Sequence, residues 1–123
     1  MEKRTEKLSR ILNELNIDGL FITDLYNLRY FTGFTGTTGV ALATKNGNFF
    51  FSDFRYKTQA TKEVTEMGFE FVEVSRGSLQ TVGEYIKKFG LKNVGFEDVN
   101  VSFSLYQTIK DTFKVELVPV GNK

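Results

Sequence analysis

The sequence feature that most constrains the fold is a hairpin signal at Asn46-Gly47, between apolar runs at residues 40–44 and 49–52. Asn-Gly readily takes the positive φ angles that a tight turn between antiparallel strands requires. Beyond the hairpin, segments with strand and helix patterns alternate to the end of the chain. This alternation is typical of α/β proteins with parallel strands. We therefore predict an α/β fold whose mixed sheet combines parallel units with an antiparallel hairpin.

Four segments show the periodicity of amphipathic helices. Asp53 and Ser78 are placed to cap the second and third of these helices, and Gly68 and Gly90 are placed to end them. The predicted helices are residues 3–15, 54–67, 78–89 and 102–113. The pattern of residues 26–31 is ambiguous and compatible with a single helical turn.

Short apolar runs predict four strands in addition to the hairpin. They are residues 20–23, 69–74, 94–96 and 115–120. Proline has no amide hydrogen for a sheet ladder, so Pro119 places the end of the last strand at a sheet edge or outside the ladder. Together with the hairpin, these runs indicate a sheet of about six strands.

The composition limits the chemistry that the chain can perform. The sequence has no Cys, which excludes disulfides and thiolate nucleophiles, and no His, the commonest metal ligand and the side chain that titrates near neutral pH. A hydrolytic site would therefore need carboxylates, Lys or Tyr with shifted pKa values. These absences disfavour a free-standing enzyme.

Length and charge favour one domain without nucleic acid or membrane as a partner. The chain has 123 residues, and its 16 basic and 15 acidic side chains give a formal charge of +1. The first ten residues are charged and lack the apolar core of a signal peptide, and no apolar run approaches membrane-spanning length. We expect residues 1–123 to form a single domain of a cytoplasmic protein.

Glycine recurs at every third position in Gly33-x-x-Gly36-x-x-Gly39. Phosphate-binding loops place backbone amides at a helix N-terminus, whereas a strand is predicted after this segment. The spacing also differs from that of the known phosphate-loop motifs. We therefore favour a loop that needs positive φ angles and close backbone approach, with a protruding recognition loop tipped by Phe34 as an alternative.

Two aromatic-basic pairs are candidates for binding a carboxylate. They are Arg29-Tyr30 and Arg55-Tyr56, whose guanidinium groups are planar, permanently charged donors. The simpler alternative is a surface ion pair of each arginine with Asp24 or Asp53.

Four acidic residues follow predicted strands: Asp24, Asp53, Glu97 and Asp98. Ligands collect at the carboxyl ends of strands in open α/β sheets, and clustered carboxylates can hold Mg²⁺ or Mn²⁺ for phosphodiester cleavage. The alternative is that these acids are helix caps and turn residues, which accounts fully for Asp53 and Asp98. The nuclease hypothesis is the weaker of the two.

Two motifs in this order carry a family resemblance. Residues 27–42, NLRYFTGFTGTTGVAL, and residues 49–60, FFFSDFRYKTQA, resemble the N-terminal domain of the creatinase / aminopeptidase P / prolidase family of "pita-bread" metallopeptidases. The family includes Xaa-Pro aminopeptidases and Xaa-Pro dipeptidases, and the motifs do not distinguish the two. The resemblance implies a mixed six-stranded sheet with helices on both faces, in agreement with the strands and helices counted above.

The resemblance also implies a division of labour. In this family, hydrolysis takes place in a C-terminal domain that holds two divalent metal ions (Mn, Co or Zn) through Asp, Asp, His, Glu and Glu. That domain is absent from residues 1–123, so the chain alone is expected to be inactive, with no catalytic residue and no metal ligand of its own. The expected partners are its own C-terminal catalytic domain, a further copy in a homo-oligomer, and a peptide substrate with proline in second position.

In this family the N-terminal domain supports oligomer contacts and narrows the mouth of the catalytic cleft. Carried onto this sequence, the resemblance gives these candidates for the cleft or an interface: Arg29, Tyr30, Phe34, Thr35, Gly36, Thr37, Asp53, Arg55 and Tyr56. A stand-alone protein-interaction module of the same fold is the alternative function.

Overall fold

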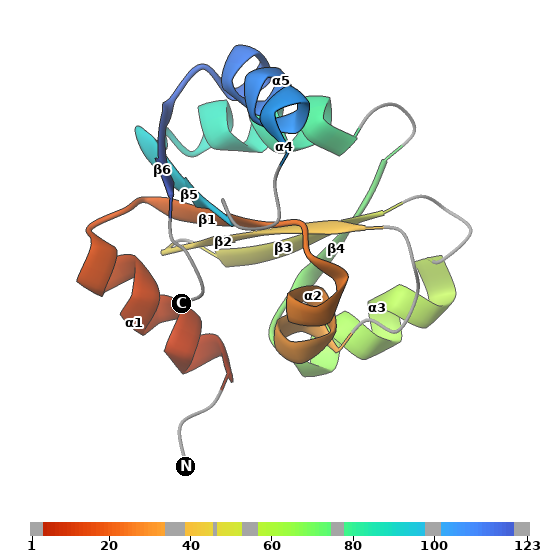
Figure 1. Cartoon of the computed structure of the whole chain (residues 1–123). Coiled ribbons are helices and arrows are strands. Elements are labelled where there is room, and N and C mark those ends of the chain that lie inside the picture. Colours follow the sequence, from red (N-terminus) through yellow and green to blue (C-terminus); the bar gives the residue numbers. More distant parts are fainter. Residues whose placement is uncertain are drawn as a thin grey trace.

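The computed structural model describes residues 4–33, 39–45, 47–52, 57–74, 78–97 and 102–119. In these residues, helices and strands alternate along most of the chain (Figure 1). The elements are α1 (Arg4–Leu15), β1 (Gly19–Ile22), α2 (Leu25–Thr32), β2 (Val40–Thr44), β3 (Gly47–Ser52), α3 (Lys57–Glu66), β4 (Glu70–Glu73), α4 (Ser78–Lys88), β5 (Asn93–Phe96), α5 (Phe103–Phe113) and β6 (Glu116–Pro119).

The described strands form one six-stranded sheet in the order β4-β3-β2-β1-β5-β6. Strand β2 runs antiparallel to β1 and to β3, whereas the pairs β3–β4, β1–β5 and β5–β6 are parallel. All strands except β2 therefore point the same way, and their carboxyl ends lie along one edge of the sheet. We call this edge the carboxyl edge.

Helices cover both faces of the sheet. Helices α1, α2 and α3 lie on one face, and α4 and α5 lie on the other (Figure 1). The two faces carry separate hydrophobic cores, and β3 supplies both of them, with Phe50 on one side and Phe49 and Phe51 on the other. Because a sheet covered on both faces buries every side chain of its central strands, these strands are continuous apolar runs without alternation.

The predicted fold class is confirmed, and so is the hairpin. Strands β2 and β3 pair antiparallel, from Val40 opposite Phe51 to Thr44 opposite Gly47. Asn46 lies outside the described residues. Strand β6 is an edge strand, as Pro119 indicated.

The predicted glycine ends of two helices are confirmed, whereas the prediction that Ser78 caps a helix is wrong, because Ser78 lies inside α4 as its first residue. Gly68 and Gly90 take positive φ angles of 87° and 66°, each two positions after the last residue of α3 or α4. The Ser102 hydroxyl accepts a hydrogen bond from Leu105 N at 3.1 Å and caps α5. The predicted cap Asp53 and the predicted helix start at Phe54 lie outside the described residues. None of the described helices is long and apolar enough to cross a membrane.

Residues 26–31 form more than the single turn that their pattern suggested. They belong to the eight-residue helix α2, which begins after Asp24 and ends at Gly33. The Asp24 carboxylate accepts a hydrogen bond from Asn27 N at 3.1 Å, and Gly33 takes a left-handed φ of 77°. Both ends of the helix are therefore capped, which stabilises a helix too short to form alone.

The position of the cores predicts that two phenylalanines contribute very differently to the free energy of unfolding. Phe50 is fully buried between β3 and its covering helices, whereas Phe103 on α5 is 77% exposed. We expect Phe50→Ala to lower the free energy of unfolding by about 3–5 kcal/mol, because it removes buried contacts and leaves a cavity. The control Phe103→Ala is expected to change it by less than about 0.5 kcal/mol. Urea denaturation measures both, and equal effects would contradict this assignment of the core.

Candidate functional site

The candidate site begins where two neighbouring parallel strands end. Strands β1 and β5 pair in register, with Phe21 opposite Phe96, so the next residues of both strands meet at the carboxyl edge. There the Glu97 carboxylate accepts hydrogen bonds from Thr23 N at 2.7 Å and Asp24 N at 2.9 Å. Its second oxygen accepts a hydrogen bond from the side-chain amide of Asn27. One carboxylate therefore joins the end of β5 to the start of α2.

Glu97 is a buried acid with a structural explanation. It is only 5% exposed, and an ionised carboxylate is rarely buried unless its oxygens accept hydrogen bonds. Backbone and side-chain amides from the β1–α2 connection supply those bonds. Because two of these donors are backbone amides, the hydrogen bonds fix the local backbone before α2.

Helix α2 presents the first aromatic-basic pair to the solvent. Arg29 is exposed and Tyr30 is 37% exposed, and both lie in the turn of α2 that follows its capped first turn. The Tyr30 ring packs edge-on against Phe31 at a centroid distance of 4.8 Å, and Lys7 Nζ of α1 lies 5.2 Å from its centroid. Cations are attracted to aromatic faces, so α1 and α2 together form a basic, aromatic surface.

Two glycines flank residues 34–38, and the structure gives each a steric role. Gly33 has a φ of 77°, and a Cβ there would lie 3.1 Å from Met67 Cγ of the α3 end. A Cβ on Gly39 would overlap the ring of Phe50. These are the positive φ angle and the close approach that were expected of the glycine segment, at its first and third glycines. Gly36 lies outside the described residues.

Most of the predicted site residues lie outside the part of the chain that the structure describes. Arg29 and Tyr30 are described, and they lie together on α2. The residues outside it are Phe34, Thr35, Gly36, Thr37, Asp53, Arg55 and Tyr56. Their role in a cleft or an interface stays a prediction.

The acidic residues that follow the strands come together only in part. Asp24 and Glu97 meet at the carboxyl edge, where Asp24 N donates to Glu97 and the Asp24 side chain caps α2. Asp53 and Asp98 lie outside the described residues. Across residues 4–33, 39–45, 47–52, 57–74, 78–97 and 102–119, no group of three or more acidic side chains could hold a metal ion. The described donors therefore do not fit a divalent metal.

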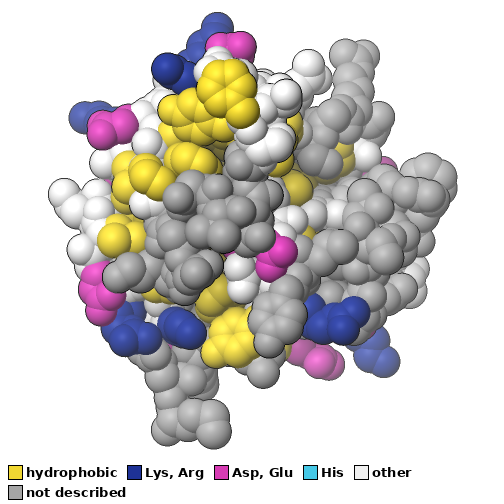
Figure 2. Space-filling view, in the orientation of Figure 1, with side chains coloured by type: hydrophobic (Ala, Val, Ile, Leu, Met, Phe, Trp, Pro, Cys, Tyr) yellow, Lys and Arg dark blue, Asp and Glu magenta, His cyan; other side chains and the backbone are white. Residues whose placement is uncertain are grey.

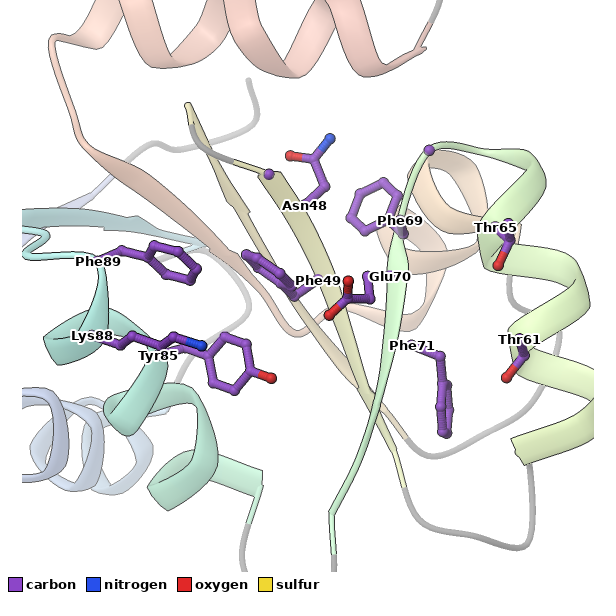
Figure 3. Close-up of a pocket in the computed structure, with 12 residues that line it drawn as sticks. Asn48, Phe49, Thr61, Thr65, Phe69, Glu70, Phe71, Tyr85, Lys88 and Phe89 are labelled. Atoms are coloured by element: carbon purple, nitrogen blue, oxygen red, sulfur yellow. The ribbon is translucent and has the colours of Figure 1, made fainter.

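A second candidate is a groove of about 880 Å³ around the edge strand β4 (Figure 3). Tyr85 and Lys88 of α4 and the following Phe89 border it on one face of the sheet, and Thr61 and Thr65 of α3 border it on the other. Phe49 stacks on Phe89 at 5.4 Å and meets Tyr85 edge-on at 5.1 Å. Neither Arg29 nor Tyr30 lines this groove.

Burial raises the pKa of the Tyr85 hydroxyl, and the negative charges of Glu70 and Glu84 raise it further. All three causes disfavour the phenolate, so Tyr85 is a neutral hydrogen-bonding group at physiological pH. The groove therefore offers an aromatic wall, a neutral hydroxyl and the Lys88 ammonium. Such groups can recognise a ligand through stacking, a hydrogen bond and a positive charge.

Sequence patterns missed two groups of residues. Thr23 and Asn27 gain their role from Glu97, which is 74 and 70 residues away in the sequence, so no local pattern announces them. Asn27 stands three residues after the capping Asp24. A polar side chain at this position can form hydrogen bonds at the start of a helix, and this spacing is the one sequence signal that could have indicated a role for Asn27. The Tyr85 cluster is likewise non-local.

The fold and the site define an α/β domain that displays an aromatic-basic helix beside the carboxyl edge of its sheet. The profile of the creatinase/prolidase N-terminal domain family matches residues 4–123, and the chain belongs to this family. The resemblance read from the two motifs is thereby confirmed.

Relatives of the chain include longer proteins and one of similar length. The "uncharacterized peptidase YqhT" of Bacillus subtilis (strain 168) is 38% identical over 119 residues, which are 96% of this chain and 33% of the relative. The solved Xaa-Pro dipeptidase from Bacillus anthracis is 33% identical, with a TM-score of 0.90 over 96% of this chain and 33% of that one. The solved aminopeptidase P, an Xaa-Pro aminopeptidase, from Streptococcus thermophilus is 31% identical, with a TM-score of 0.88 over 97% of this chain and 91% of that one.

This chain therefore spans about a third of the length of the first two relatives. The solved chain from Streptococcus thermophilus, by contrast, is close to it in length.

The contact between Gly39 and Phe50 makes a specific prediction. Gly39→Ala is expected to lower the free energy of unfolding by about 1–3 kcal/mol, because the new methyl group must displace a fully buried ring. In a Phe50→Leu background the clash is relieved, so the same substitution should cost much less. Chemical denaturation of the two single variants and the double variant gives the coupling energy. Additive effects would contradict the contact.

Tyr85 predicts an effect of alkaline pH. Because the pKa of Tyr85 is raised in the folded chain, the unfolded chain releases this proton at lower pH. The contribution of Tyr85 to the free energy of unfolding is therefore complete below the ordinary tyrosine pKa of about 10 and is lost as the pH rises through the folded pKa. We expect the absorbance titration of tyrosinate to lose its late component in Tyr85→Phe. The unfolded chain, in which the five tyrosines titrate alike, is the reference. Loss of an early component would contradict the assignment.

Proposed function

We propose that this chain is the non-catalytic N-terminal domain of an Xaa-Pro peptidase. In this proposal residues 1–123 form one domain, and a C-terminal metallopeptidase domain follows in the full-length protein. The N-terminal domain shapes the substrate cleft and contributes oligomer contacts. The substrate is a peptide with proline in second position.

The lengths of the relatives carry the proposal. The chain matches about a third of the peptidase YqhT and of the Xaa-Pro dipeptidase from Bacillus anthracis. At 38% and 33% identity over nearly the whole chain, the similarity extends well beyond a shared fold. The remaining two-thirds of a longer protein leaves room for a separate catalytic domain.

The chemistry of the side chains supports the same division. Two divalent metal ions (Mn, Co or Zn), held by the C-terminal domain, would activate the water that attacks the scissile carbonyl. The present sequence has no His and no Cys. Of the two described carboxylates that meet at the carboxyl edge, Asp24 caps α2 and Glu97 accepts from the amides before that helix. This chain therefore contributes recognition and shape.

Helix α2 is the described element best suited to recognition. Arg29 offers a planar, permanently charged donor for a peptide carboxylate, and the partly exposed Tyr30 ring beside it offers an apolar face with a hydroxyl. Both residues sit on a helix whose two ends are fixed, so binding would cost little ordering of the backbone. We propose that they face the cleft, together with the predicted residues of 34–37 and 53–56.

Oligomer contacts would use apolar surface on the opposite face. Hydrophobic side chains reach the surface near α5 in Figure 2, and Phe103 on that helix is 77% exposed. A large exposed aromatic is a common anchor of protein interfaces. This surface is separate from α2, so one domain could serve both roles.

The proposal predicts where activity resides. Purified residues 1–123, incubated with Xaa-Pro peptides and Mn²⁺, Co²⁺ or Zn²⁺, are expected to release no product. The protein encoded by the complete reading frame is expected to cleave them. In that protein Arg29→Ala should raise KM by about tenfold, because a charged hydrogen bond to the substrate is lost.

The matched control is Lys87→Ala, which removes an exposed positive charge from α4 on the other face of the sheet. It is expected to leave KM unchanged. Turnover that copurifies with residues 1–123, or a complete protein that cleaves no Xaa-Pro peptide, would overturn the proposal.

A further inference from the structure

The Glu97 cluster contains more hydrogen bonds than the pairing of β1 with β5 needs. The two strands are already joined by a parallel ladder from Gly19–Val94 to Phe21–Phe96. At the amino-terminal ends of β1 and β5, a second set of hydrogen bonds also connects the two strands. There the Asp18 carboxylate accepts from Lys92 N at 2.8 Å, and Asp18 N donates to the Asn93 side chain at 2.7 Å.

Among the residues that the structure describes, the hydrogen-bond partners of Glu97 belong to the connection that leads into α2 and to the first turn of that helix. They are the backbone amides of Thr23 and Asp24, the Thr23 hydroxyl at 3.5 Å and the Asn27 side chain. Asp24 is the capping residue of α2, and Asn27 lies in its first turn. The buried Glu97 at the end of β5 therefore fixes the capped start of α2, although its partners lie 70 or more residues earlier in the sequence.

We propose that Glu97 is the positioning residue of α2: its buried carboxylate sets where the helix begins and hence where Arg29 and Tyr30 are displayed. Helix α2 has only eight residues, too few to hold its place by helix propensity. With Glu97 in place, the first turn is anchored through the backbone at Thr23 and Asp24 and through the side chain of Asn27. The exposed pair then follows one turn later on a fixed helix.

The contact between Glu97 and Asn27 allows a test that separates positioning from general helix stability. An acidic residue in the first turn of a helix is ordinarily neutral or favourable, because it interacts well with the helix N-terminus. Helix rules alone therefore predict that Asn27→Asp is harmless. The Glu97 contact predicts the reverse, since the new carboxylate on half-buried residue 27 would face the buried carboxylate of Glu97.

The experiment measures amide hydrogen exchange in the 123-residue chain by NMR. In Asn27→Asp, the amides of α2, including those of Leu28 and Gly33, are expected to exchange faster by on the order of tenfold or more. In the double variant Glu97→Gln/Asn27→Asp, the new glutamine amide can donate to the new aspartate. Exchange in α2 is then expected to return toward the wild-type rate.

Asp18→Asn is the matched control, because it alters a carboxylate that accepts a hydrogen bond from Lys92 N between the starts of the same two strands, β1 and β5. It is expected to leave α2 exchange at the wild-type rate. Should Asn27→Asp fail to fold, recovery of the folded chain in the double variant supports the proposal equally. Unchanged or slower α2 exchange in Asn27→Asp, no recovery in the double variant, or equal loosening of α2 in Asp18→Asn would overturn it.

The significance of this device for recognition rests on the proposed function, in which α2 faces the substrate cleft. The exchange experiment itself does not depend on it. A helix positioned by Glu97 in a chain whose complete protein cleaves no Xaa-Pro peptide would leave the positioning role standing and remove the peptidase proposal. If the complete protein cleaves Xaa-Pro peptides but hydrogen exchange in α2 does not change in Asn27→Asp, the peptidase proposal stands and the positioning role of Glu97 is removed.

Discussion

The parallel pairing of β1 with β5 is the constraint on which the rest of the structure depends. It brings together segments about 75 residues apart and leaves β1 with β2 on its other side, at the centre of the sheet. Because the register aligns Phe21 with Phe96, the residues that follow both strands meet at the carboxyl edge. The burial of Glu97 and the cap of α2 are consequences of this register.

Local chemistry made a large part of the fold predictable. The hairpin and the glycine ends of α3 and α4 depend on residues within a few positions of each other, so single stretches of sequence indicate them. The apolar runs could be assigned to strands because a sheet with helices on both faces buries every side chain of a central strand. The class and the number of strands follow from these patterns.

Non-local contacts account for what the sequence did not predict. Helix α2 was underestimated because its start is held by Glu97, and nothing within residues 26–31 indicates such a partner. The same reason applies to the groove at β4, where Phe49, Tyr85 and Phe89 meet only after the sheet and α4 are assembled. Of the site, Arg29 and Tyr30 could be named from the sequence, whereas Glu97 was named only as a candidate metal ligand or turn residue, and its contacts with the start of α2 were not predicted.

The edge strands bear on how copies of this domain could associate. Strand β4 reads Glu-Phe-Val-Glu over Glu70–Glu73, and both terminal side chains are exposed. If two copies paired antiparallel along this edge, Glu70 of one would lie opposite Glu73 of the other, and like charges directly opposite destabilise a ladder. Strand β6 is also a poor partner for a strand of another copy, because Pro119 has no amide hydrogen to donate. Oligomer contacts of the kind proposed would therefore be made by side chains of helices such as α5, since both sheet edges oppose strand pairing.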